Sequence, residues 1–108
     1  IMPRAPGHTL IIPKNPASNL LDVDPGDLAH VAQVSQRIAR ATMKAFDADG
    51  ITLQQFNESA GGQVVFHLHV HVIPRHDGIS MKPPASEMAR PKDLAAAAEK
   101  IRAALKAS

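Results

Sequence analysis

The sequence predicts an α+β domain in which an antiparallel sheet carries its helices on one face. Short β-branched or alternating segments indicate three strands, and apolar residues spaced by three and four indicate two helices. The predicted order is strand, helix, two strands, helix. Residues 58–63 form a connection short enough to make the last two strands an antiparallel hairpin, which favours the α+β class.

Three segments predict the strands. Residues 8–13 form a β-branched run that a proline ends, and residues 51–57 alternate between apolar and polar side chains. Residues 64–73 form the longest predicted strand and contain three histidines. The residues before the first strand are rich in proline and glycine and are therefore expected to form a loop.

Start signals followed by apolar stripes predict the helices. Asp24 can cap the first helix and Pro25 suits its first position, with an end expected near residues 45–46. The second helix is expected to open at Pro91, after a polar loop over residues 75–89. Alanine, the best helix former, fills most of this second helix outside its apolar side.

Composition limits the classes of protein that the chain can represent. With 108 residues, 44 % of them hydrophobic and 20 % charged, the chain predicts one soluble globular domain. It contains no cysteine and no apolar stretch of membrane-spanning length, so disulfides and membranes are not expected, and we expect a cytoplasmic protein. The net charge of +2 is spread along the chain with few aromatic residues, which does not favour nucleic-acid binding.

Three histidines alternate with apolar residues in the last predicted strand. Because side chains alternate between the faces of a strand, His67, His69 and His71 are expected to line one face. Phe66, together with the other apolar residues between the histidines, is expected to fill the opposite face.

Three interpretations of this row compete. It could be the polar face of a surface strand, or it could begin a metal site, since zinc accepts three histidines. The third interpretation is nucleophilic catalysis at phosphorus, because neutral imidazole is a nucleophile near pH 7. Few carboxylates and no cysteine are at hand to complete a metal shell, and the Gly61-Gly62-Gln63 turn before the row can offer backbone N–H groups to an anion. The combination favours the third interpretation.

At this point the chain resembles the histidine triad (HIT) superfamily, in particular its Hint-like and bacterial members. The residues His67-Leu-His69-Val-His71-Val-Ile match the family motif in full. Residues 5–14, which carry a fourth histidine, and residues 57–63 resemble two further family blocks. The resemblance implies a single HIT domain over residues 1–108, with a divergent loop and helix over 76–108 and with the family's N-terminal helix and hairpin lying before Ile1.

The resemblance also implies roles for individual residues. His69 would attack the α-phosphorus of a nucleotide, His71 would bind the phosphate, and His67 would support the His69 imidazole in a network extended by His8. The nucleotide-binding residues would include His69 and His71 together with Ile1, Asn57, Gly62, Gln63 and Val64.

The sequence departs from the family pattern in ways that bear on function. Val64 stands where relatives often carry Ser or Thr, so that no hydroxyl is present there to help the leaving group depart. Some bacterial relatives bind zinc through cysteines that this chain does not have, so neither zinc nor another cofactor is expected.

The predicted function is hydrolysis at the α-phosphorus of AMP-linked substrates, that is purine nucleotide derivatives, through a nucleotidyl-histidine intermediate. The substrate would be a nucleoside phosphoramidate, as for Hint-like proteins, or alternatively a dinucleoside polyphosphate, as for Fhit-like proteins. A non-catalytic nucleotide-binding scaffold is the alternative from another class. The resemblance further implies a homodimer, which would also cover an unpaired edge strand.

Overall fold

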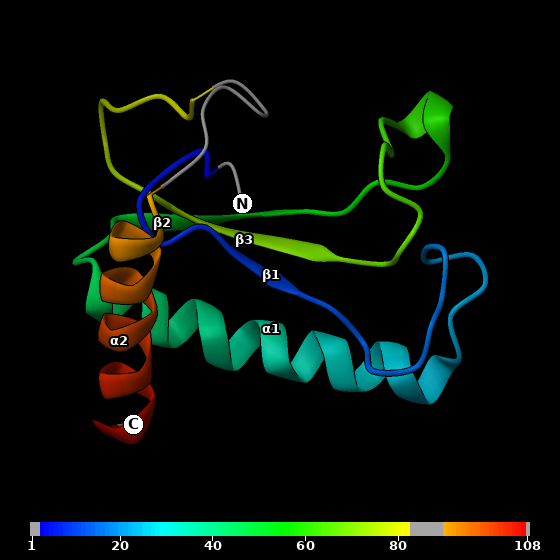
Figure 1. The fold of residues 1–108 in the computed structure, drawn as a ribbon, viewed down its shortest axis with the longest axis horizontal. Helices are drawn as coiled ribbons and strands as arrows, with labels where there is room; N and C mark the ends of the chain where they lie inside the picture. Colours follow the sequence, from blue (N-terminus) through cyan, green and yellow to red (C-terminus); the bar gives the residue numbers. More distant parts are fainter. Residues whose placement is uncertain (1–2, 83–89, 108) are drawn as a thin grey trace.

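The computed structural model describes residues 3–82 and 90–107, and its three strands form one antiparallel sheet. The strands are β1 (Thr9–Ile11), β2 (Gly50–Gln54) and β3 (Val70–Arg75), in the order β1-β3-β2 (Figure 1). Because β3 lies between the other two, its residues 72–74 are fully buried. The α+β prediction, with an antiparallel sheet, is confirmed.

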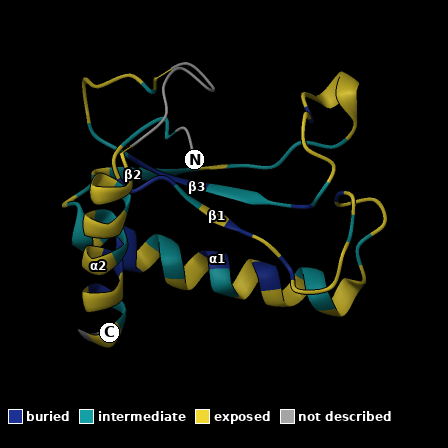
Figure 2. Ribbon diagram, viewed as in Figure 1, coloured by how far each residue is buried: buried dark blue, intermediate teal, exposed yellow. Residues whose placement is uncertain are grey.

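Helix α1 (Pro25–Ala45) lies along one face of the sheet and supplies most of its core (Figure 1). It begins as predicted, since the Asp24 carboxylate accepts hydrogen bonds from the first-turn amides and Pro25 occupies the first turn. Val31 packs against Ile11 and Val72, which come from the neighbouring strands β1 and β3. Figure 2 shows that buried residues occur on α1 and on the strands β1 and β3.

Helix α2 (Pro91–Ala107) packs on α1 and not on the sheet. A second apolar cluster joins them, formed by Ala41 of α1 with Ile101 and Ala104 of α2. Alanine at these positions lets the two helix backbones approach closely. None of the helices in the described residues is long and apolar enough to cross a membrane.

The histidine strand is shorter than the sequence pattern predicts. It begins at Val70 and not at residue 64, because its partner β1 ends at Ile11, which pairs with Val70. Continuing the ladder would bring Pro13 opposite Leu68, and proline has no N–H to contribute. Instead, the Leu68 N–H donates to the carbonyl oxygen of Ala17, 2.8 Å away, and the chain turns away from the sheet.

As a consequence, His67 and His69 lie in the segment that leads into β3 and only His71 lies within the strand. The expected apolar face is also incomplete. Leu68 is buried, whereas Phe66 is 50 % exposed. The other two strands are likewise shorter than the predicted ranges 8–13 and 51–57.

Candidate active site

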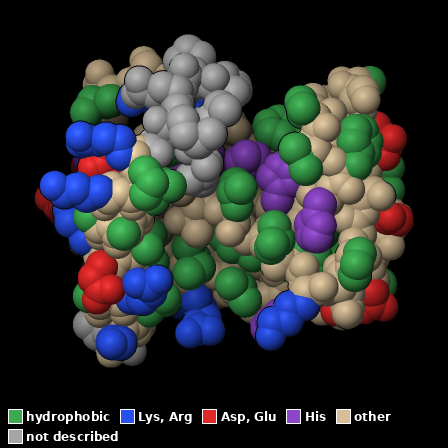
Figure 3. Space-filling view, viewed as in Figure 1, with side chains coloured by type: hydrophobic (Ala, Val, Ile, Leu, Met, Phe, Trp, Pro, Cys, Tyr) green, Lys and Arg blue, Asp and Glu red, His purple; other side chains and the backbone are tan. Residues whose placement is uncertain are grey.

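Histidine side chains gather on one face of the molecule (Figure 3). The rings of His69 and His71 meet edge to face with centroids 4.9 Å apart, although only one of these residues belongs to the strand. The His8 ring lies on the other side of His71, at 5.1 Å. His8 precedes β1, and in the sheet Leu10 of β1 pairs with His71. The sheet therefore brings together histidines that are separated by sixty residues in sequence.

The His69 imidazole is held in one tautomer. Its Nδ1 lies 2.6 Å from the carbonyl oxygen of His67. Because a carbonyl oxygen only accepts hydrogen bonds, Nδ1 carries the proton and Nε2 of the neutral ring carries the lone pair. Nε2 of His69 is thus chemically suited to attack an electrophile.

The tautomers of His8 and His71 follow from the same reasoning. The N–H of Arg4 donates to Nδ1 of His8 over 3.0 Å, so the neutral His8 ring carries its proton on Nε2. That proton is donated to Nδ1 of His71 over 2.8 Å. His71 therefore carries its own proton on Nε2, where it can donate to a ligand.

Both of these rings are held in the neutral form at pH 7. Burial lowers the pKa of His71 to about 4, with further contributions from the nearby charges of His8, His69 and Arg4. The pKa of His8 is also lowered, first by burial and then by Arg4. Neither ring is protonated near pH 7, so both act there as neutral hydrogen-bonding groups.

His67 contributes differently from the prediction. Its backbone carbonyl, and not its imidazole, holds His69. The Nε2 atom of His67 is buried and has no hydrogen-bond partner among the described residues. The hydrogen bond between the two residues is thus made by the His67 backbone, and support of His69 by the His67 ring stays a prediction.

The Gln63 side chain is part of a buried network. Its Oε1 accepts from the Asn19 amide at 3.0 Å and from the Glu58 N–H at 2.8 Å, and its Nε2 donates to the carbonyl oxygens of Ser18 and Val65. Glu58 has a φ of 66°, a conformation that side chains other than glycine rarely adopt, and it is held there by these contacts. Gln63 thereby fixes the turn that precedes the histidines.

The glycine turn does not offer the amides that the sequence predicts. The N–H groups of Gly61, Gly62 and Gln63 donate to carbonyl oxygens of Glu58 and Ser59 within the turn. The Val64 N–H, in contrast, finds no acceptor in residues 3–82 or 90–107. Its side chain is 87 % exposed, so this part of the chain is accessible to a ligand.

Asn57 lies beyond the end of β2, where its amide is fixed by neighbours. It exchanges two hydrogen bonds of 2.9 Å with the side chain of Gln55, and its Oδ1 also accepts from the Leu20 N–H. One hydrogen of the Asn57 amide nitrogen is left without a partner in the described chain, and it is available to a ligand. Ile1, the remaining predicted nucleotide contact, lies outside the described residues.

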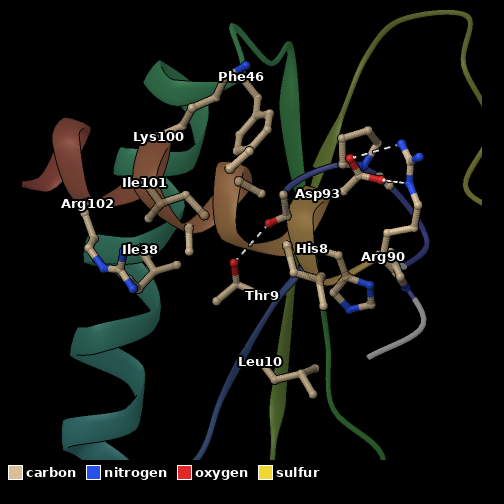
Figure 4. A pocket seen from close by; sticks show the side chains of 18 of the residues that line it. His8, Thr9, Leu10, Ile38, Phe46, Arg90, Asp93, Lys100, Ile101 and Arg102 are labelled. Atoms are coloured by element: carbon tan, nitrogen blue, oxygen red, sulfur yellow. Dashed lines mark hydrogen bonds and ion pairs between the residues drawn. The ribbon is translucent and has the colours of Figure 1, made fainter. Parts of the chain in front are cut away.

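A large cavity lies beside the histidines and not over them. It has a volume of about 1040 Å³ and opens between the loop before β1 and helix α2 (Figure 4). Phe46, Ile38 and Ile101 give it an apolar wall, and the exposed Arg90–Asp93 ion pair lies at its edge. His8 is the only one of the four site histidines in its lining, and His69 does not line it.

Several residues of this site cannot be recognised as site residues from the sequence pattern. Asn19 is 1 % exposed and joins Glu58 to Gln63, yet it lies in a segment that reads as a loop. Arg4 lies in a proline-rich stretch that has no periodicity. In the described part of the chain, no three histidine, aspartate or glutamate residues are placed to hold a metal ion together.

Comparison with known proteins decides the family. The HIT domain model matches residues 1–78, which include all four site histidines. The chain belongs to the HIT family. This places it in a superfamily of nucleotide-binding proteins and hydrolases.

Individual relatives of this HIT chain extend over most of its fold. A HIT-like protein from Bartonella henselae, described as involved in cell-cycle regulation, is 53 % identical, with a TM-score of 0.92 over 96 % of this chain and 75 % of that one. A hypothetical histidine triad nucleotide-binding protein from Sulfolobus tokodaii is 32 % identical, with a TM-score of 0.85 over 97 % and 73 %.

One of the relatives carries the name of an enzyme. Adenylylsulfatase HINT3 of Arabidopsis thaliana is 39 % identical over 75 residues, which are 69 % of this chain and 38 % of that protein. The chain spans about half the length of the first curated relatives that it matches.

Proposed function

We propose that this HIT protein hydrolyses AMP-linked substrates at the α-phosphorus through a nucleotidyl intermediate on His69. The observation that carries the proposal is the fixed tautomer of His69, whose Nδ1–H is committed to the His67 carbonyl oxygen. The lone pair on Nε2 is therefore oriented and available without a base to remove a proton. Membership in the HIT family supports the choice of a nucleotide as substrate.

Two chemical steps follow from this assignment. In the first, Nε2 of His69 forms a bond to the α-phosphorus. The bond between the phosphorus and the leaving group breaks, and its electron pair passes to the leaving group. In the second, water attacks the phosphorus, the bond to His69 breaks, and the nucleoside monophosphate is released with a proton passing to solvent. The His71 Nε2–H and the Val64 N–H are donors suited to the phosphoryl oxygens, on which charge develops.

The leaving group is constrained by what the site does not provide. Val64 has no hydroxyl, and His71 and His8 are neutral donors that do not readily give up a proton. An amine must be protonated to leave, whereas sulfate or a phosphate chain leaves as an anion. This favours anionic leaving groups, such as those of adenylyl sulfate or a dinucleoside polyphosphate, over the amine of a phosphoramidate. The Arabidopsis adenylylsulfatase among the relatives is consistent with this choice.

Assembly as a homodimer is part of the same proposal. β2 is an edge strand, and its Leu53 is 56 % exposed although it pairs with the buried Val72. An exposed apolar edge of this kind is commonly covered by another strand or subunit. The molar mass in solution, measured by light scattering, tests this part independently of catalysis.

The test of the chemistry is trapping of the covalent intermediate. Purified protein is mixed with adenylyl sulfate, a diadenosine polyphosphate or adenosine phosphoramidate, quenched with base, and analysed by mass spectrometry of its peptides. We expect an adenylyl group on His69 and release of AMP, both lost in His69→Ala. His30→Ala is the matched control, because His30 is an exposed residue on α1.

The alternatives give different results in this experiment. Binding of AMP with no turnover of any of the three substrates would favour a nucleotide-binding scaffold. Adenylation that persists in His69→Ala would show that another residue is the nucleophile.

A further inference from the structure

Arg4 donates hydrogen bonds to three other residues near the His8–His71 pair. Its backbone N–H donates to Nδ1 of His8 at 3.0 Å. Its side chain donates from Nε to the carbonyl oxygen of Lys82 at 2.8 Å and from Nη1 to Oε1 of Gln54 at 3.1 Å. The Lys82 N–H in turn donates to the Arg4 carbonyl oxygen at 2.9 Å.

These contacts join three parts of the chain at the His71 side of the site. Arg4 comes from the loop before β1, Gln54 is the residue of β2 that pairs with His71, and Lys82 follows β3. The acceptors that Arg4 uses are an amide and a carbonyl oxygen, which are both uncharged. Within residues 3–82 and 90–107, no carboxylate pairs with the Arg4 guanidinium.

We propose that Arg4 is a positioning residue that keeps the His8–His71 pair neutral and in a single tautomer. This role deepens the proposed hydrolase function and rests on it. The backbone N–H of Arg4 fixes the orientation of His8, and the guanidinium ties the flanking elements together while placing a positive charge beside both rings.

The hydrogen bonds explain why only the neutral pair fits. A proton added to Nδ1 of His8 would oppose the Arg4 N–H, donor against donor. A proton added to Nδ1 of His71 would oppose the Nε2–H of His8 in the same way. The nearby guanidinium adds electrostatic repulsion to either imidazolium.

Among residues 3–82 and 90–107, no negatively charged group contributes to the pKa of His71. The charged or titratable groups that act on His71 are His8, from the segment before β1, His69, from its own segment, and Arg4. Phe56, which contacts the His71 ring edge to face, is uncharged. Burial is the largest cause of the low pKa of His71, followed by His8 and His69, and the Arg4 charge makes the smallest contribution of the four.

The test compares Arg4→Gln with Arg4→Lys by NMR titration of the histidine ring nitrogens, which needs no substrate. Arg4→Gln removes the charge, and we expect the pKa of His71 to rise by less than about one unit, because close charges shift a pKa by about 1–3 units and Arg4 is the smallest of the causes that act on His71. Arg4→Lys keeps the charge, and its His71 pKa should stay near that of the unmodified protein. Arg37→Gln, which removes an exposed charge from α1, is the control.

The same variants have a kinetic signature if the proposed hydrolysis holds. Below pH 5, kcat/KM of Arg4→Gln relative to that of Arg4→Lys should fall, because more of His71 is protonated there in Arg4→Gln, with much less difference between the two variants at pH 8. An unchanged His71 pKa in Arg4→Gln, or equal shifts in Arg4→Gln and Arg4→Lys, would overturn the role of Arg4. Because the titration is independent of turnover, the absence of hydrolysis would contradict the proposed function alone.

Discussion

The rings of His8 and His71 share a hydrogen bond of 2.8 Å that only one arrangement of protons satisfies. His8 must donate from Nε2, since its Nδ1 already accepts from the Arg4 N–H. His71 must then present a donor at its outer nitrogen. A hydrogen-bond pattern outside the motif thus determines which atom of a motif histidine faces a ligand.

This pair makes the stability of the fold depend on pH. The pKa of His71 is about 4 in the folded protein against 6.5 for an ordinary histidine, so between these values the unfolded chain binds more protons. Stability is therefore complete above pH 6.5 and falls as the pH drops toward 4. Because the ring is only half-buried, we expect a loss of ~1–2 kcal/mol and not the full value that the shift implies.

Urea unfolding at pH 7.5, 6, 5 and 4 measures this dependence. His71→Asn should flatten the decline between pH 6.5 and 4, and His30→Asn should leave it unchanged. The lowered pKa of Asp22, caused first by hydrogen bonds from the backbone N–H groups of Asn19 and Ser18, acts mainly near and below pH 4, at the acidic end of this window. A decline that is equally steep in His71→Asn would assign it to other groups.

Gln63 is expected to stabilise the fold more than a typical surface glutamine. Gln63→Ala would leave the Asn19 amide, the Glu58 N–H and two carbonyl oxygens without their partner. Unsatisfied buried groups cost about 1–3 kcal/mol each, and relaxation offsets part of that cost. We therefore expect Gln63→Ala to lower the free energy of unfolding by ~2–4 kcal/mol in total.

Urea unfolding of Gln63→Ala measures the loss. The control is Gln33→Ala, on the exposed side of α1, which should change stability by ~0.5 kcal/mol or less. A similar small change in both variants would show that water replaces the network.

Much of the fold could be predicted from local sequence signals. The Asp24-Pro25 start places α1 correctly because capping depends only on neighbouring residues. The length of the histidine strand could not be predicted in this way, since it is limited by the end of β1 at Ile11 and by Pro13 just beyond it. The pattern at residues 67–71 shows which side chains alternate but not whether a partner strand is present to pair with them.

The candidate site also combines features that the sequence predicts with features that depend on the folded structure. The four histidines are recognisable from their motif and from the block around His8, whereas their tautomers depend on Arg4 and on a backbone carbonyl. The glycine turn was expected to have unpaired amides, but its short 3-10 helix (Ser59–Gly61) and the hydrogen bonds that follow it use them internally. Such closure depends on the turn type, and two adjacent glycines are compatible with several turns.

The two glycines of this turn should respond differently to substitution. Gly62 has a φ of +98°, and an added Cβ would lie 3.3 Å from the Phe56 ring, which itself contacts His71. Gly62→Ala should cost ~1–3 kcal/mol of stability through backbone strain and should also lower turnover.

Gly61 has no atom within 4 Å of an added Cβ and no positive φ. Gly61→Ala is therefore the matched control and should leave stability nearly unchanged. Thermal unfolding of both variants measures the difference, and equal losses would show that the strain is not at Gly62.

Substitution of Val64 tests the assignment of the leaving group. Its side chain is 87 % exposed, so Val64→Ser should fold normally while placing a hydroxyl just after the turn. If protonation limits departure of an amine, the hydroxyl should raise kcat for adenosine phosphoramidate by ~10-fold or more, since it can relay a proton to the amine while taking one from solvent, and positioned proton transfer contributes about 10²–10⁴-fold. Cleavage of adenylyl sulfate should change little, because sulfate leaves as an anion.

Val64→Ala, which removes the branched side chain without adding a donor, separates the effect of the hydroxyl from a steric effect. An equal gain for both substrates, or the same gain in Val64→Ala, would contradict a proton-transfer role and would leave access to His69 as the property that residue 64 controls.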